Sequence, residues 1–490
     1  MSLPSEYKLQ HCLQMANVES DLKKTCAYKK KAVDHLLSSL FEKCKPIPGN
    51  EEIIVTGYVM SDGKGDWFNM LNTCKYLQKK FPERTIRLIA ISGEQHRGQL
   101  TAPKVKALDL HYFKDAEISA PTIFPQEIAN GPELVEKVRG AAAVVFGPVN
   151  IYGLYSQLGA ELYRTGIALF EYDANTNTDR LSGTKAFMGL DKAFSIGIFT
   201  RAMKNSYTWK DIHNEKLQNL LFGAIHPPDE AIHSYLQTHS IFLCYMGFMK
   251  ALTFFLDAAS FAHAHDPDKS VDICFPCKSS MDELNQFLPR KELQELGFGS
   301  ITMTYYEDGT QKEVKRRLGD GKKAFRILDV GGLAPKDFRI LMKLSSPLVG
   351  CTGDNSLAQA LSYGKIPFYE VVGHKVPLRH NLLSIIEEKF GLHSSLYTYL
   401  VSGANIKERA AKVSAPTLPS EAEQLGEWIR NHFSANSAIQ GLVNQRLLLG
   451  KDPALAQKVH KLQKEYLAGN LSIEQLEEHL VFDLKNLGLI

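Results

Sequence analysis

The sequence predicts an α/β protein with two domains, each built around a parallel sheet. The chain has 490 residues, which is too long for one ordinary core and indicates two domains with extensions. Short strand-like runs alternate with helical segments in two series of similar size, which meet near residue 235. Because a chain that alternates in this way builds a parallel sheet covered by helices, we expect two Rossmann-like domains facing a cleft.

The composition is typical of a globular protein, with 44% hydrophobic and 23% charged residues. A formal charge of +3 is too small to indicate a nucleic-acid partner or an anionic membrane surface. The eight cysteines are scattered, which favours reduced thiols and a cytoplasmic location over a disulfide framework. We expect no signal peptide and no membrane span, because no run of about 18 apolar residues occurs.

We expect the chain to divide into four segments. Residues 1–50 form a polar helical extension, and residues 51–235 form the N-terminal Rossmann-like domain. Residues 236–414 form the C-terminal Rossmann-like domain. Residues 415–490 form a second helical extension, because this part is rich in Gln, Glu, Lys and Leu with helical spacing.

The first series begins with an apolar strand and a glycine-containing turn at residues 61–66. A helical segment then runs to about Lys80. The strands are expected at 53–58, 85–91, 106–112, 142–146, 166–172 and 194–199, and two further helices at 132–139 and 155–165. The turn lacks the GxGxxG pattern, and no acidic residue clearly follows the second strand, so we do not assign a dinucleotide site.

The second series contains the stretch 349–372, around which the rest of the chain is organised. Strands are expected at 240–245, 271–275, 300–305, 324–328 and 347–349, with helices at 248–263 and 335–344. The last of these strands enters the polar turn 352–356, and apolar residues then recur at helical spacing. Gly364 occupies the place of a helix C-cap, and Ile366 begins another strand.

The start of this helix suits a diphosphate, because its unpaired N–H groups and its dipole favour anions. Gly353, Asn355 and Ser356 are therefore expected to bind the diphosphate, although an ordinary capped helix is the alternative. Tyr245, at the end of its strand, is expected to stack on a base or to be part of the core. Four cations after the next strand could neutralise the diphosphate or be solvated: His374, Lys375, Arg379 and His380.

Both polar turns follow the carboxyl ends of strands, which is where ligands bind in open parallel sheets. In the first turn, Gly65 allows the backbone to approach a ligand closely. Asp66 is expected to act as a general base on an acceptor, or else to cap the helix. Asp62 and Asp354 complete an acidic pocket, unless Asp62 only stabilises its turn and Asp354 only caps its helix.

No metal site is expected. Asp266 and Asp268 have a DxD spacing, but they lie in a polar loop, and His263 and His265 have no matching carboxylate or cysteine set. The sequence contains no P-loop and no GxSxG motif, and its single CxxC lacks a second half.

Several short motifs occur in an order that is similar to a known family. They are Asp62-Gly63-Lys64-Gly65-Asp66, Gly189-Leu190-Asp191-Lys192-Ala193-Phe194, Phe242-Leu243-Cys244-Tyr245, and the turn 352–356 followed by Ala360 to Phe368. Together they resemble the GT-B glycosyltransferases, and more narrowly the bacterial protein-arginine rhamnosyltransferases that modify elongation factor P. The resemblance covers roughly residues 50 to 390. Thr352, Asp354 and Asn355 stand where that family has arginine, its catalytic glutamate and aspartate.

The resemblance implies inverting, metal-independent transfer of a sugar from a dTDP- or UDP-linked donor, with no separate cofactor. The donor is expected on the C-terminal domain and the acceptor on the N-terminal domain. A protein side chain is the favoured acceptor, and arginine is one candidate because an acidic pocket suits a guanidinium group. Two alternatives stay open: a sugar-nucleotide epimerase or hydrolase of the same fold, and a catalytically silent module that binds a partner.

Overall fold

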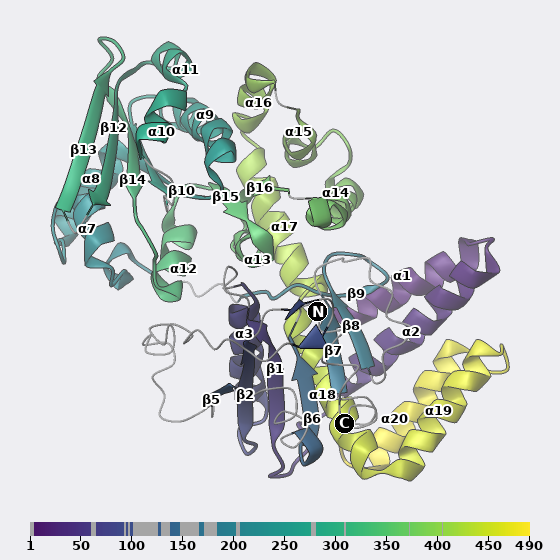
Figure 1. Ribbon diagram of the computed structural model, residues 1–490. Coiled ribbons are helices and arrows are strands. Elements are labelled where there is room, and N and C mark those ends of the chain that lie inside the picture. Colours follow the sequence, from purple (N-terminus) through teal and green to yellow (C-terminus); the bar gives the residue numbers. More distant parts are fainter. Residues whose placement is uncertain are drawn as a thin grey trace.

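The computed structural model contains two α/β domains that lie one above the other (Figure 1). It describes residues 4–59, 65–92, 95–96, 99–100, 126–128, 138–147, 166–170, 184–201, 206–275, 281–307, 310–371, 373–403 and 405–490. Among these residues, no helix combines the length and the apolar character needed to cross a membrane. The predicted fold class, an α/β protein with two Rossmann-like sheets, is confirmed.

The first sheet has seven parallel strands in the order β5-β2-β1-β6-β7-β8-β9. The strands are β1 (Ile53–Val59), β2 (Ile86–Ser92), β5 (Gln126–Ile128), β6 (Ala143–Phe146), β7 (Gly166–Phe170), β8 (Thr184–Met188) and β9 (Ser195–Gly197). Strands β6 and β7 are buried at every residue, as expected for a parallel sheet covered on both faces. Strands β3 (Gln95–His96) and β4 (Gln99–Leu100) form a separate two-stranded sheet.

The second sheet also has seven strands, in the order β13-β12-β14-β11-β10-β15-β16. The strands are β10 (His239–Tyr245), β11 (Ser270–Phe275), β12 (Phe298–Glu307), β13 (Thr310–Arg317), β14 (Lys323–Asp329), β15 (Leu348–Thr352) and β16 (Ile366–Glu370). Only β13 is antiparallel to its neighbour.

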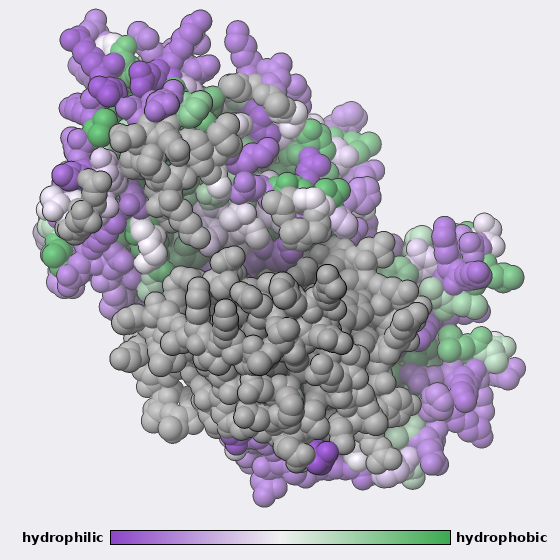
Figure 2. Space-filling model, viewed as in Figure 1, coloured by the Kyte–Doolittle hydropathy of each residue, from purple (hydrophilic) through white to green (hydrophobic). Residues whose placement is uncertain are grey.

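Some expected elements differ from the structure. The strands β3, β4, β5, β8 and β13 were missed. Strand β13 has no hydrophobic pattern because it is an edge strand with nearly all its side chains exposed. Figure 2 shows the described surface of the second domain as largely hydrophilic. The expected strand 106–112, the expected helix 155–165 and most of the helix 132–139 lie outside the described residues.

The helices of the two domains cover both sheets. They are α3 (Gly65–Lys80), α7 (Glu215–Phe222), α8 (Asp229–Thr238), α9 (Phe248–His265), α10 (Met281–Phe287), α11 (Arg290–Glu295), α12 (Pro335–Leu344), α13 (Gly353–Ser362), α14 (Val376–Phe390), α15 (Ser395–Val401) and α16 (Ile406–Val413), with short 3-10 turns η4 (Trp209–Asp211) and η5 (Gly373–Lys375). The segment from η4 to α8 precedes the boundary expected near residue 235, yet it packs on the second sheet. The backbone N–H of His213 donates to Asp337 of α12 at 2.7 Å, and Tyr235 of α8 donates a hydrogen bond to Asp272 of β11.

The two chain ends pack together beside the first sheet (Figure 1). The N-terminal helices are α1 (Pro4–Val18) and α2 (Leu22–Lys43), and the C-terminal ones are α17 (Leu418–His432), α18 (Ala435–Lys451), α19 (Pro453–Leu467) and α20 (Ile473–Asn486). Helix α17 passes from the second domain to the first, and α18 contacts α2 and the strands β6, β7 and β9. The ends of the chain therefore help to build the first domain.

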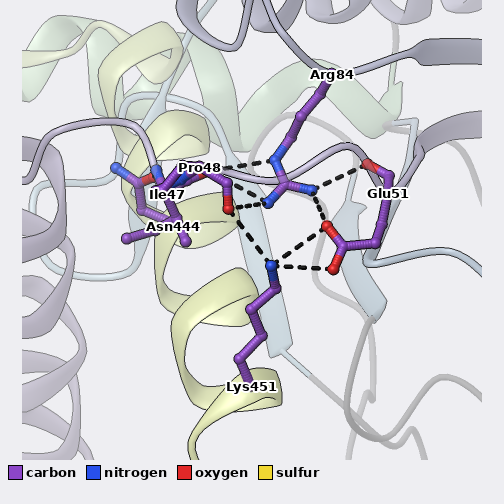
Figure 3. A network of polar contacts seen from close by, with 6 residues as sticks. All are labelled: Ile47, Pro48, Glu51, Arg84, Asn444 and Lys451. Carbon is purple, nitrogen blue, oxygen red and sulfur yellow. Dashed lines mark hydrogen bonds and ion pairs between the residues drawn. The ribbon is translucent and has the colours of Figure 1, made fainter.

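A buried arginine connects the chain ends to this sheet (Figure 3). The Arg84 side chain is 1% exposed, and its guanidinium donates to the carbonyl oxygens of Ile47 and Pro48 at 3.0–3.2 Å. It also donates to the Glu51 carboxylate at 3.1 Å, which Lys451 of α18 approaches at 3.0 Å. The network therefore fixes the segment between α2 and β1 against β2 and α18.

We expect Arg84→Met to lower the free energy of unfolding by about 2–4 kcal/mol, because it leaves buried carbonyl groups without donors. Urea denaturation followed by circular dichroism measures the change. The control is Lys451→Met, whose side chain is 43% exposed and whose loss should cost at most about 1 kcal/mol. Equal losses in the two variants would contradict the role assigned to the buried guanidinium.

Stability should also depend on the protonation of Glu42, at the contact between α1 and α2. Its carboxylate accepts hydrogen bonds from Ser5 and Ser38, and burial raises its pKa from 4.5 to about 7. Because the folded state then holds a proton that the unfolded state has released, stability falls as the pH rises from about 4.5 through 7. We expect Glu42→Gln to remove this loss.

The stability difference between Glu42→Gln and the natural protein should therefore grow between pH 5 and pH 8, by up to about 3 kcal/mol. Chemical denaturation at a series of pH values measures it. The Gln carbonyl can still accept both serine hydrogen bonds. A difference that stays constant over this range would show that Glu42 does not hold a proton in the folded protein.

Candidate functional site

In each sheet the described strands include a place where the chain turns from building one side of the sheet to building the other. In the first sheet it lies between β1 and β6, and in the second sheet between β10 and β15. The connecting helices leave on opposite faces at such a point, so a crevice opens at the carboxyl ends of the two central strands, and ligands bind there. The two polar turns singled out in the sequence both follow a strand at one of these points: β1 in the first sheet and β15 in the second.

In the first sheet, the candidate residues follow β1. This strand ends at Val59, and α3 begins at Gly65, so Asp66 lies in the first turn of the helix. Asp62 lies outside the described residues, as does the side chain of Asp66. Their catalytic roles therefore stay predictions. Packing at this point is close: a Cβ atom on Gly57 or Gly147 would lie 2.8 or 2.7 Å from the side chain of Met70.

In the second sheet, the structure brings Tyr245 and the turn 352–356 together. Tyr245 is the last residue of β10 and pairs with Cys351 of the neighbouring strand β15. The residue is 41% exposed, and its ring packs edge to face on Phe338 of α12 at 5.1 Å. Because so much of Tyr245 faces outward, it is not a plain core residue, and a base could stack on it.

The first turn of α13 is open where the chain enters it. Thr352 is the N-cap residue, and its side chain makes no capping hydrogen bond. Gly353 has a φ of +72°, a conformation that favours glycine, and a Cβ atom there would meet nothing within 4 Å. The hydroxyl of Ser356 donates to the carbonyl oxygens of Thr352 and Gly353. Its backbone N–H still belongs to the first turn of the helix.

Asp354 forms an ion pair with Lys375. The distance from its Oδ2 to the Lys375 Nζ is 2.6 Å, and the two side chains are only 12% and 10% exposed. The hydroxyl of Tyr369 lies 3.5 Å from the other carboxylate oxygen. Lys375 is thus placed beside the start of α13, whereas Arg379 donates to the carbonyl of Leu400 and lines a different cavity.

Of the other two residues predicted to neutralise the diphosphate, His380 is exposed, and the side chain of His374 lies outside the described residues.

Sequence reasoning missed Glu370, the last residue of β16, whose carboxylate accepts a hydrogen bond from the Gly247 N–H at 2.9 Å. Its position at a strand end was the available signal.

The helices that follow the two turns touch each other, since α3 contacts α13. Arg201 lies at this contact, and sequence reasoning missed it because it stands in an irregular segment. Its guanidinium donates to Asn72 of α3 at 2.8 Å, and its backbone N–H donates to Ser362 of α13 at 3.3 Å. Burial lowers the pKa of Arg201. Arg201 therefore connects the two helices that begin at the candidate site, with its side chain on α3 and its backbone on α13.

The Asp354–Lys375 pair should stabilise the second domain measurably. In a double-mutant cycle with Asp354→Asn and Lys375→Met, we expect a coupling energy of about 1–3 kcal/mol, because both groups are largely buried. Chemical unfolding of the four proteins measures it. The comparison pair is Glu408 with Lys412, whose side chains are 49% and 28% exposed, and its coupling should stay below about 0.5 kcal/mol. Equal coupling in the two pairs would contradict the prediction.

Comparisons with known proteins found only weakly similar solved structures. No protein-family model and no curated protein sequence matches the chain. A putative UDP-N-acetylglucosamine 2-epimerase from Listeria monocytogenes is 11% identical, with 84% of this chain and 98% of that chain covered and a TM-score of 0.42. A mutant O-GlcNAc transferase from Thermobaculum terrenum is 10% identical, with 91% and 80% covered and a TM-score of 0.36.

A third similar structure is the spinosyn rhamnosyltransferase SpnG complexed with thymidine diphosphate. It is 10% identical, 79% of this chain and 98% of that chain are covered, and the TM-score is 0.39. At such values these likenesses do not establish a family for this chain. The two-sheet architecture and the candidate site stand on the chain's own strand order and contacts.

Proposed function

We propose that this protein transfers a sugar from a nucleotide-diphosphate donor to an acceptor, with a protein side chain as the favoured acceptor. One observation carries the proposal: glycine-containing turns follow central strands where the strand order reverses in both sheets, and the helices that begin there touch. On this proposal, two binding crevices lie on the two sides of this contact. A reaction that joins two substrates, a donor and an acceptor, fits this arrangement.

The donor would bind at the second sheet. Its base stacks on the exposed ring of Tyr245, and its diphosphate lies against the N–H groups of the first turn of α13, beside Gly353, Asn355 and Ser356. Lys375 lies beside this turn, held by Asp354 at 2.6 Å, and its ammonium group donates a hydrogen bond to a phosphate oxygen. The donor is dTDP- or UDP-linked. These groups stabilise the negative charge that develops on the leaving diphosphate.

The acceptor would bind at the first sheet, opposite the donor. Asp66 takes the proton from the acceptor nucleophile while that nucleophile attacks the anomeric carbon from the face opposite the diphosphate. The bond from the anomeric carbon to the diphosphate oxygen breaks, and the product has inverted configuration. Gly65 lets the backbone approach the substrates, and Asp62 adds negative charge that suits an arginine acceptor.

Nucleotide binding tests the donor half of this proposal. In calorimetric titrations with UDP and dTDP, we expect Tyr245→Ala to weaken binding about tenfold or more, because base stacking on an aromatic ring contributes about 1–3 kcal/mol. Tyr245→Phe is the matched control, since it keeps the ring and should keep the affinity. If neither nucleotide binds, the protein is better described as a partner-binding module.

Transfer tests the acceptor half. After incubation of candidate acceptor proteins with a mixed pool of nucleotide sugars, intact-mass analysis should show a mass increment equal to one sugar. We expect Asp66→Asn to reduce the transfer rate at least about a hundredfold while nucleotide affinity stays unchanged. Full transfer by a folded Asp66→Asn protein would exclude Asp66 as the base. Turnover of the nucleotide sugar without an acceptor would instead indicate an epimerase or a hydrolase.

A further inference from the structure

A cavity lies in the second domain, next to the turn 352–356 but lined by other residues. Its volume is about 310 Å³. Its walls come from the first turns of α9, the strand β16 and the helices α14 to α16. The lining residues are Lys250, Thr253, Pro367, Phe368, Tyr369, Val371, Arg379, Leu382, Leu383, Tyr399, Leu400, Ser402, Gly403 and Arg409. This set includes neither Tyr245 nor any residue of the turn 352–356. It contains no Asp or Glu.

The charge around this cavity is positive. Arg409 is neutralised, because its guanidinium bonds the buried carboxylate of Asp257 at 2.6 Å. Arg379 donates only to the carbonyl oxygen of Leu400, at 2.9 Å, within the described part of the chain. Lys250 is exposed and makes no hydrogen bond or ion pair with any described residue. Among the described residues, Arg409 thus has a carboxylate partner, whereas Arg379 and Lys250 have none.

The cations are held beside apolar walls. The Arg409 guanidinium lies 4.8 Å from the ring centre of Phe368 and 5.1 Å from that of Tyr399, and the Tyr399 hydroxyl donates to Asp257 at 3.0 Å. Leu382, Leu383 and Leu400 line the cavity beside these rings. A cavity with apolar walls and a few polar groups is typical of small-molecule sites, and this volume is at the small end of their range of roughly 300–1,000 Å³.

We propose that this cavity binds a small anion that carries one apolar ring and one phosphate or carboxylate group. Lys250 and Arg379 neutralise the anionic group, and the leucines and Phe368 contact the ring. The volume suits a single ring and is small for a complete nucleotide sugar, so this ligand is distinct from the sugar donor. Tyr369 lies between this cavity and the proposed donor site, since it lines the cavity and its hydroxyl is 3.5 Å from Asp354.

Phenyl phosphate is a suitable probe, because it combines one ring with one phosphate. In calorimetric titrations of the full chain, we expect it to bind more tightly than inorganic phosphate or phenol. Lys250→Gln should weaken phenyl phosphate binding about tenfold, the usual effect of losing a charge-assisted hydrogen bond. The matched control is Lys407→Gln on α16, which is exposed and does not line the cavity.

A second variant blocks the cavity without removing charge. A Cβ atom on Gly403 would meet nothing within 4 Å, so Gly403→Leu should fold normally and abolish phenyl phosphate binding. Unchanged affinity in both Lys250→Gln and Gly403→Leu would overturn the proposal. Displacement of phenyl phosphate by UDP would overturn it too, because the cavity would then belong to the donor site. These titrations test ligand binding in the cavity whether or not the protein transfers a sugar.

Discussion

The reversal of strand order within each sheet is the constraint on which the rest of the structure depends. Crossover connections between parallel strands are right-handed, so helices on the two sides of a reversal must lie on opposite faces. By this rule, a crevice is expected at the carboxyl ends of β1 and β6, and of β10 and β15. The turns that follow β1 and β15 begin at these two places, and their helices α3 and α13 meet.

Close packing around glycine maintains these two points. Gly57 and Gly147 leave room for the side chain of Met70, and Gly350 leaves room for that of Met246, whose sulfur would lie 2.7 Å from an added Cβ atom. The same principle connects the C-terminal helices to both domains. Helix α17 packs on α13 at Gly364 and Gly426, and the segment after it pairs with the strand end at Ile198 through hydrogen bonds of 2.8 and 2.9 Å. Helix α17 and the segment after it thus contact both domains and fix the two sheets relative to each other.

Much of this arrangement could be predicted from local pattern, and the failures have physical causes. The buried strands of both sheets show continuous apolar runs, so β1, β6, β10 and β11 were predicted close to their observed bounds. The edge strand β13 reads TQKEVKRR and has no such run, because its side chains face solvent. The sequence did not reveal the bonds of the Ser356 hydroxyl, because a serine inside a helix can donate to a preceding carbonyl, as it does here.

The sequence by itself determined the alternation of strands and helices, the two polar turns and the helix starts, because these depend on residue spacing along the chain. Only the tertiary structure decided which groups meet. It paired Asp354 with Lys375, placed Tyr245 beside the start of α13, and put Arg201 between the two domains. It also gathered Lys250, Arg379 and Arg409 around one cavity, from helices far apart in the chain. Contacts of this kind follow from strand order and helix packing, which local spacing does not encode.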